Sequence, residues 1–308
     1  MYFIFLGFAL LASAISANKV LLASVPPTFF VGIRMLTAGV ILWFMYHRTS
    51  DRLRWIYLKD DALKIFLAAF FTTCVPSLCK AFALKYMPSA KAAFIGSLDP
   101  FVTAIYSYFL FQDKLNLKKI LGILVGFSGS MILCFSNYAS EQGFHAFLIF
   151  SFPELAAFAS MAIGRYGWLL AQSMLKRDRY APAELNGVMF CISGVLALCL
   201  SAFIDNYSSL NLCFSWQWLL LFAYTVFVGN IIAYTMYATF LRIHSANFVS
   251  LAGFSVPIFV AFFGYVFLNE KMTANLVTSA LVILFGVYLF YQEELASLMR
   301  ERVHYRKH

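Results

Sequence analysis

Long apolar stretches separated by short polar segments account for most of the chain. Each stretch is close to the roughly 20 residues that a helix needs to cross a bilayer. The stretches are apolar on every face, whereas the strands of a membrane barrel alternate apolar with polar residues. The pattern predicts an all-α integral membrane protein with ten transmembrane helices, at approximately 2–22, 28–46, 62–83, 90–111, 117–136, 146–170, 182–204, 216–241, 246–268 and 274–291.

The composition leads to the same class of protein. Of the 308 residues, 62% are apolar and only 12% are charged, whereas about a quarter of a soluble domain is charged. This balance excludes a water-soluble enzyme, a disordered chain and a secreted disulfide scaffold. The six cysteines form no C-x-x-C pair, and the five histidines form no H-E-x-x-H motif. We therefore expect no metal, no cofactor and no enzymatic activity.

Basic residues are distributed unevenly between the two sets of predicted loops. With the N-terminus in the cytoplasm, the outer loops carry only Lys85, Lys91 and Lys271, whereas the inner loops and the C-terminal tail carry fifteen Lys and Arg. Such a bias marks the cytoplasmic side of a membrane protein. We expect a multi-pass protein of the cell inner membrane (cytoplasmic membrane) with both termini in the cytoplasm. The net charge of +9 then reflects topology and not the binding of nucleic acid.

The chain also repeats itself. When the sequence is shifted by 157 positions, residues 81–129 align with 238–286 without a gap. The landmarks of this alignment are the pairs Gly96/Gly253, Pro100/Pro257, Lys114/Lys271, Asp113/Glu270 and Gly129/Gly286. Paired glycines, prolines and acidic–basic turns in one register are hard to obtain by chance, even between apolar sequences.

The repeat determines the predicted architecture. Because each half holds five spans, an odd number, the second half must enter the membrane upside down. Inverted repeats are typical of secondary transporters, which hold their substrate near the membrane midplane. The predicted units are a first repeat at 1–136, a second repeat at 146–291 and a basic cytoplasmic tail at 292–308.

An acidic residue lies inside one of the apolar stretches. Asp99 is near the middle of 90–111 and directly precedes Pro100, which cannot donate a backbone hydrogen bond. Charged groups inside a membrane are costly and usually functional. Asp99 is therefore a candidate for binding substrate or protons, and the alternative is a structural ion pair with Lys or Arg. Two structural hinges are also predicted, at Gly96 and Pro100 and at their repeat mates Gly253 and Pro257.

A basic residue, Arg165, lies deep in the sixth stretch. It is about 15 Å along a helix from the basic loop at Lys176, which is too far for its side chain to reach the membrane surface easily. A second alignment, of the first stretch on the sixth, pairs Arg165 with Asn18. A guanidinium at this depth suits a carboxylate or phosphate, so both residues are candidates for substrate binding. The alternative is that Arg165 pairs with Asp99 or Glu154.

Two predicted helices carry polar residues at helical spacing. Thr73, Ser77 and Lys80 follow each other at i, i+4 and i+7, which places them on one helix face. The repeat mates of these three residues are also polar: Asn230, Tyr234 and Tyr237. Two matched polar stripes predict two walls of a cavity. The hydroxyls of the first stripe are more typical of contacts between helices, and Lys80 could alternatively reach the outer membrane interface. The candidates for cavity lining are Lys80, Asn230, Tyr234 and Tyr237.

Two further residues have competing interpretations. Arg34, about two helical turns inside the second stretch, either bonds helix-end carbonyls and holds the halves together or contacts substrate. Trp168 either stacks on a planar substrate or packs against its neighbours, since aromatic residues make up 19% of the chain. Gly122, Gly126 and Gly129 form a small-residue face, which predicts packing between helices.

Three segments resemble a known family. They are PPTFFVGIRMLTAG, which contains Arg34, then ALKYMPSAKAAFIGSLDPFVTAIYSYFLFQDKLNLKKILGILVGFSG, and its echo LRIHSANFVSLAGFSVPIFVAFFGYVFLNEKMTANLVTSALVILFG. In the order and duplication of these segments, the chain resembles an EamA-type member of the drug/metabolite transporter superfamily. One departure is Asp113, where the family usually has Glu, as at Glu270. The resemblance implies ten helices, a central cavity lined by spans 1–4 and 6–9, and alternating access.

The candidate residues and the resemblance together predict a secondary transporter for a small organic metabolite. Arg165 suits a carboxylate, Asp99 suits an ammonium or sulfonium, and aromatic walls suit stacking or cation–π contacts. These features favour an amino acid or an amino-acid derivative, and the resemblance allows aromatic amino acids and S-adenosylmethionine. The alternatives are a multidrug or lipophilic-cation exporter and, from another class, a channel or a non-enzymatic membrane structural protein.

The expected partners follow from this function. The sequence contains no ATPase motif, so a gradient or an exchange must drive transport. We expect a small-molecule substrate, the lipid bilayer, and either protons or a counter-substrate moved by antiport. The chain is expected to act as a monomer or a homodimer and to bind no nucleic acid.

Overall fold

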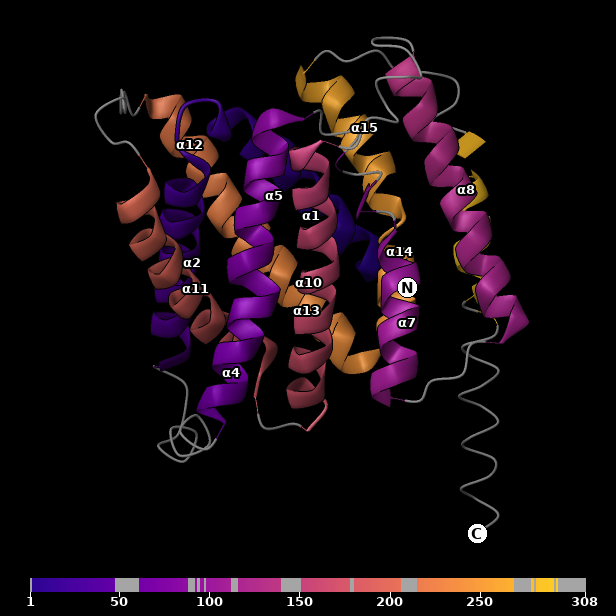
Figure 1. Cartoon of the computed structure of the whole chain (residues 1–308), viewed down its shortest axis with the longest axis horizontal. Coiled ribbons are helices and arrows are strands. Elements are labelled where there is room, and N and C mark those ends of the chain that lie inside the picture. The colour runs from indigo at the N-terminus through magenta and orange to yellow at the C-terminus, as the bar shows by residue number, and fades with distance from the viewer. Residues whose placement is uncertain are drawn as a thin grey trace.

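The fold is a bundle of helices. A computed structural model of the chain describes residues 2–47, 61–87, 98–111, 116–139, 151–177, 180–205, 215–268 and 281–290, with the single positions 92, 95, 96, 278, 279 and 292. Every regular element within these residues is a helix, as the sequence predicts. Figure 1 shows the long helices standing side by side.

The helices follow the predicted apolar stretches. Their bounds are α1 (Tyr2–Leu22), α2 (Pro27–His47), α4 (Ala62–Ala69), η1 (Phe70–Cys74), α5 (Val75–Tyr86), α7 (Asp99–Phe111), α8 (Leu117–Ala139), α10 (Phe152–Leu175), α11 (Pro182–Ile204), α12 (Trp216–Tyr224), η3 (Thr225–Ala233), α13 (Tyr234–Ile243), α14 (Ala246–Ala252) and α15 (Ser255–Leu268). A last apolar helix runs over Leu281–Phe290. The label η marks a π-helix.

Five of the described helices are long and apolar enough to cross a membrane. They are Phe3–Leu22, Pro27–Met45, Ala62–Tyr86, Pro182–Ile204 and Trp216–Ile243. The third and fifth of these are continuous through the π-helical segments η1 and η3. These helices correspond to predicted spans one, two, three, seven and eight.

A proline and a partly buried carboxylate fix the beginning of α2. Pro27 is the first residue of the helix, a position that suits its fixed φ and its missing N–H. At the end of α11, the Asp205 carboxylate accepts hydrogen bonds from the Thr28 hydroxyl and from the Phe29 backbone N–H (3.1 Å). Asp205 thereby caps α2 and ties it to α11.

Glycines allow α2 and α11 to pack closely along their lengths. A Cβ added at Gly39 would lie 2.6 Å from the backbone nitrogen of Cys191, and one at Gly194 would lie 2.5 Å from that of Leu36. No side chain fits in either space. Small residues at contacts are how membrane helices approach each other, so this interface is built by its glycines.

The glycine face of α8 packs as the sequence predicts. The helix Leu281–Phe290 lies against it, with the Gly286 backbone on that of Gly126 and with Ile283 against Gly129. Elsewhere α5 packs against α10, α1 against η3 and α15, and α7 against α10 and α14. These last contacts surround the centre of the bundle.

Two of the spans contain π-helical turns. The Val75 N–H donates to the carbonyl of Phe70, and the Tyr234 N–H donates to that of Gly229, five residues back in each case. Such a turn holds one residue more than an α-helical turn, and it is often found at functional sites. The residues that follow are therefore rotated relative to a regular helix.

A second pair of elements is interrupted by turns. The sequence predicts Asp99 near the middle of a continuous span, whereas the structure places it in the first turn of α7, after a turn at Leu98. The reason is Pro100, which fits the first turn of a helix and not its interior. In the same way, a turn at Gly253 and Phe254 separates α14 from α15.

Candidate functional site

A cavity of about 280 Å³ lies in the middle of the bundle. It extends toward the end of α1, where Leu22, Phe30 and Leu84 line it. Most of the predicted site residues line this cavity: Asn18, Arg34, Lys80, Asp99, Arg165, Trp168, Tyr234 and Tyr237, together with Gly96, Pro100 and Gly253. Asn230 is not among the lining residues, and the side chain of Pro257 lies outside the described residues.

An ion pair occupies one end of the cavity. Arg165 of α10 donates through Nε to Asp99 Oδ1 at 2.7 Å and through Nη2 to Asp99 Oδ2, and its Nη1 donates to the Tyr237 hydroxyl at 2.7 Å. Two parallel bonds between guanidinium and carboxylate are a strong and directional arrangement. The sequence leaves open whether Arg165 pairs with Asp99 or contacts substrate, and in this structure the two residues are paired.

Aromatic rings form the wall beside the ion pair. Trp168 packs edge-on against Tyr237, with ring centroids 4.7 Å apart, and lies 6.0 Å from Tyr234. Phe8 of α1 packs edge-on against the other side of Tyr237. The sequence offers packing or stacking on substrate as roles for Trp168. Trp168 is 8% exposed, and it both packs and lines the cavity.

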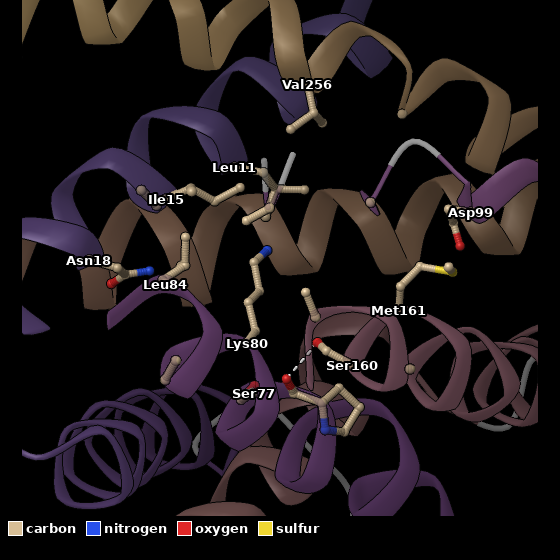
Figure 2. A pocket seen from close by; sticks show the side chains of 18 of the residues that line it. Leu11, Ile15, Asn18, Ser77, Lys80, Leu84, Asp99, Ser160, Met161 and Val256 are labelled. Carbon is tan, nitrogen blue, oxygen red and sulfur yellow. Dashed lines mark hydrogen bonds between the residues drawn. The ribbon is translucent and has the colours of Figure 1, made fainter. Parts of the chain in front are cut away.

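Lys80 points into the cavity. Figure 2 shows its side chain extended from α5, between Asn18 on one side and Asp99 on the other. The residue is exposed although it lies inside the bundle, because its free surface faces the cavity. Within the described part of the chain, no carboxylate forms an ion pair with Lys80. The cavity therefore contains a cation that is accessible to a ligand.

Arg34 is held in the wall near Lys80. Its Nη1 donates to Asn230 Oδ1 at 3.0 Å, and its guanidinium lies over the Phe30 ring at 5.4 Å. Asn230 in turn donates to the Met35 sulfur at 3.2 Å. Only 7% of Arg34 is exposed, and its Nε has no hydrogen-bond partner among the described residues. The sequence suggests helix-end carbonyls as partners of Arg34, whereas the structure shows the side-chain amide of Asn230 in that place.

The π-helical turns correct one of the predicted lining positions. At regular spacing Asn230 would face the cavity, but it is fully buried behind the wall, and Gly229 lines the cavity instead. The repeat mate behaves in the same way: Thr73 bonds Ser193 of α11 at 2.5 Å, and Thr72 lines the cavity. The extra residue of a π turn changes the i, i+4 face to an i, i+5 face.

At the opposite end of the bundle, hydrogen bonds that the sequence did not predict connect the helices. Gln172 of α10 donates to the carbonyls of Leu241 and His244, at 2.8 and 3.1 Å. The Tyr180 hydroxyl donates to Asp61 at 3.1 Å. A buried amide in an apolar helix was a usable signal for Gln172, since such groups need partners. No local pattern relates Asp61 to Tyr180, 119 positions away.

Among the residues that the structure describes, His, Cys, Asp and Glu side chains do not gather in groups of three or more that could hold a metal ion. The cysteines that it describes are free thiols: Cys74, Cys79, Cys191 and Cys199. What the cavity offers is charge, hydrogen bonds and aromatic surface.

Comparison with known proteins identifies relatives along nearly the whole chain. The S-adenosylmethionine/S-adenosylhomocysteine transporter of Chlamydia muridarum (strain MoPn / Nigg) is 26% identical over 299 residues, covering 95% of this chain and 92% of the relative. That of Chlamydia trachomatis serovar L2 is 27% identical over 297 residues, covering 95% and 89%. The uncharacterized transporter YoaV of Bacillus subtilis is 21% identical, covering 89% and 90%.

A solved structure shares the fold of this chain, and the sequence shows its family. One solved structure, described only as "Crystal structure of protein", has a TM-score of 0.73 at 16% identity and covers 97% of each chain. The sequence profile of the EamA-like transporter family matches residues 1–135 and again residues 151–292. The chain therefore belongs to the EamA-like transporter family, and it is a multi-pass membrane transporter of small metabolites.

Proposed function

We propose that the chain carries S-adenosylmethionine, S-adenosylhomocysteine or both across the cytoplasmic membrane by alternating access. The observation that carries this proposal is the similarity to two chlamydial transporters so named, which extends over 95% of the chain. Because the match runs through every helix that lines the cavity, it concerns the transport path and not a single conserved segment.

The chemistry of the cavity supports this substrate class. Both molecules carry a carboxylate, an ammonium group and a flat adenine base, and S-adenosylmethionine also carries a sulfonium. The cavity offers a free cation at Lys80, an acid at Asp99 and the rings of Trp168 and Tyr237. Its volume of about 280 Å³ is near the lower end of the range, about 300–1,000 Å³, that is usual for small-molecule sites.

The arrangement of the helices supports two inverted repeats of five. If the two halves are exchanged, the contact between η1 and α10 maps onto that between η3 and α1. In the same way, the contact of α5 with α10 maps onto that of α13 with α1, and α7 with α10 maps onto α15 with α1. The pair α2–α11 maps onto itself. The π-helical segments and the interrupted helices also fall at corresponding positions of the 157-residue register. The proposed units remain 1–136 and 146–291, with a tail at 292–308.

The distribution of charge supports an outward-open state. If both termini are cytoplasmic, the end of α1 lies on the outer side, and the cavity extends toward that end. The inner end is then the one closed by Gln172 and by the Asp61–Tyr180 contact. Reporter fusions after His47, Asn137 and Asn206 test this orientation. An external signal at His47, or an internal one at Asn137, would overturn it.

Uptake measurements test the substrate. We expect purified protein in liposomes to take up radiolabelled S-adenosylmethionine in a saturable manner, and faster when S-adenosylhomocysteine is enclosed, because an exchanger is trans-stimulated. A panel of amino acids, nucleosides and lipophilic cations serves as competitor. Inhibition by lipophilic cations alone would replace this proposal by the exporter alternative, and flux without saturation would indicate a channel.

The same assay distinguishes proton coupling from exchange. Asp99 is our candidate for a proton site, since it is the acid that lines the cavity in the described part of the chain. If protons drive transport through Asp99, uptake by Asp99→Asn loses its dependence on a pH gradient. If the dependence persists in the variant, Asp99 does not couple transport to protons.

A further inference from the structure

The cavity contains two cations in different situations. Arg165 is fixed, because its Nε, Nη1 and Nη2 each donate to Asp99 or Tyr237. A substrate carboxylate that replaced Asp99 on this guanidinium would leave a charged Asp99 without its partner in a mostly buried position, which is strongly unfavourable. The ion pair is therefore a poor receptor for a second carboxylate.

Lys80 has the opposite properties. It has three N–H donors and no acceptor of its own, its surface faces the cavity, and it forms no ion pair within the described residues. Figure 2 shows Lys80 projecting among apolar side chains of α1, Leu11 and Ile15. An ammonium group in such surroundings gains more from a ligand anion than it would in bulk water.

Two neighbouring groups also favour the binding of an anion beside Lys80. Arg34 lines the same cavity, and its buried Nε has no hydrogen-bond partner among the described residues. Its charge repels that of Lys80, so both cations gain when an anion comes close. A side-chain amide, Asn18, also lines the cavity, on the side of Lys80 away from Asp99, and it can contact a carboxylate through its NH₂ group.

We propose that Lys80 is the carboxylate receptor of the transport cavity, with Arg34 as the supporting charge. The Asp99–Arg165 pair then stays intact when the substrate binds in this state. The assignment rests on the proposed function and makes it more specific: the carrier selects ligands with a free amino-acid carboxylate, and nucleosides that lack this group bind weakly. It also moves the carboxylate site from Arg165, which residue type alone favoured, to Lys80.

The test compares one ligand with and without its carboxylate. S-adenosylhomocysteine and its decarboxylated derivative compete with radiolabelled S-adenosylhomocysteine for purified protein in detergent. In the wild type we expect the decarboxylated ligand to bind about ten- to a hundred-fold more weakly, the usual range for a hydrogen bond to a charged group. Lys80→Gln should weaken S-adenosylhomocysteine by a similar factor and leave the decarboxylated ligand within about two-fold.

Two further variants are the matched controls. Lys80→Arg keeps the charge and should retain most of the affinity for the carboxylated ligand. Lys85→Gln removes an exposed cation from the same helix that does not line the cavity, and it should change neither affinity. Binding of the decarboxylated ligand shows directly that a variant is folded.

Each other outcome overturns a defined part of the argument. If Lys80→Gln weakens both ligands equally, or neither, the assignment of the carboxylate to Lys80 is wrong while the proposed function stands. If the wild type binds both ligands equally, the cavity does not use the carboxylate at all. If it binds neither S-adenosylmethionine nor S-adenosylhomocysteine, the proposed function is wrong and the assignment falls with it.

Discussion

The π-helical segments η1 and η3 have similar backbones and different side chains. In both, the cavity-facing residue is the one before the position that regular spacing predicts, Thr72 instead of Thr73 and Gly229 instead of Asn230. The displaced residue then bonds to a neighbouring helix, Ser193 of α11 in one case and Arg34 of α2 in the other.

The side chains that follow these segments give the two walls different chemistry. After η1 the cavity receives the ammonium of Lys80, and after η3 it receives the ring of Tyr237. Likewise, the acid Asp99 lies opposite Val256 in the register of the repeat. The comparison teaches that similar backbones in the two halves can build a cavity, while side chains that differ between the halves set which chemical groups face it.

The largest expected effect comes from removing the negative charge of Asp99, which has no counterpart at Val256 in the second half. Asp99→Asn leaves the buried Arg165 guanidinium without its counter-charge, which costs about 3–5 kcal/mol. We expect a large fall in the unfolding temperature of the purified protein and a strongly reduced rate of uptake. The double variant Asp99→Asn/Arg165→Gln should recover much of the stability without recovering uptake. Equal stability of the single variant and the wild type would contradict the ion pair.

A second prediction contrasts the two displaced residues. Asn230→Ala removes the acceptor of the Arg34 guanidinium, at a cost of about 2 kcal/mol for a bond to a charged group. Because Arg34 lines the cavity, we expect uptake to fall roughly ten-fold. The matched variant Thr73→Val removes a neutral bond to Ser193, should cost about 1 kcal/mol of stability, and should leave uptake unchanged. The same loss of uptake in both variants would mean that the two segments have equivalent roles.

A third prediction concerns the aromatic wall. Tyr237→Phe removes the hydroxyl that accepts from Arg165 Nη1 and should cost about 1.5 kcal/mol in substrate binding or stability. The control is Tyr224→Phe, which loses a hydroxyl bond to Ser13 (2.7 Å) outside the cavity. We expect the affinity for S-adenosylhomocysteine to change only in the first variant. A change of similar size in both variants would mean that the Tyr237 hydroxyl has no special role in the cavity.

The smallest expected effect is a preference between the two proposed substrates. Three cations, Arg34, Lys80 and Arg165, and one acid, Asp99, line the described cavity, so its net charge is positive. The sulfonium of S-adenosylmethionine adds a positive charge that S-adenosylhomocysteine lacks. Coulomb repulsion over this range should make S-adenosylhomocysteine the several-fold tighter competitor at neutral pH. Tighter binding of S-adenosylmethionine would show that the sulfonium has an acidic or aromatic partner that outweighs the repulsion.

Several residues that line the cavity could be predicted, because polar residues are conspicuous in apolar helices. Asp99, Arg165 and Lys80 each stand out against long runs of apolar residues. A charged side chain inside a membrane is energetically costly and usually has a functional or pairing role. Regular helical spacing predicts that Asn230 faces the cavity, and this is wrong because one π turn rotates the side chains by about one residue. Nothing in the amino-acid composition of the segment indicates such a turn. The partners of Gln172 and Asp61 were also out of reach, since they lie on other helices.

The sequence by itself determined the class of protein, the positions of its apolar helices and the inventory of charged groups. These depend on the free energy of moving each residue from water into hydrocarbon, which is a property of the residue and its near neighbours. Only the tertiary structure decided that Arg165 binds Asp99 and that Lys80 faces the cavity without an acid. Pairing depends on distances between side chains of different helices, and these are set by glycine contacts, π turns and interrupted helices acting together.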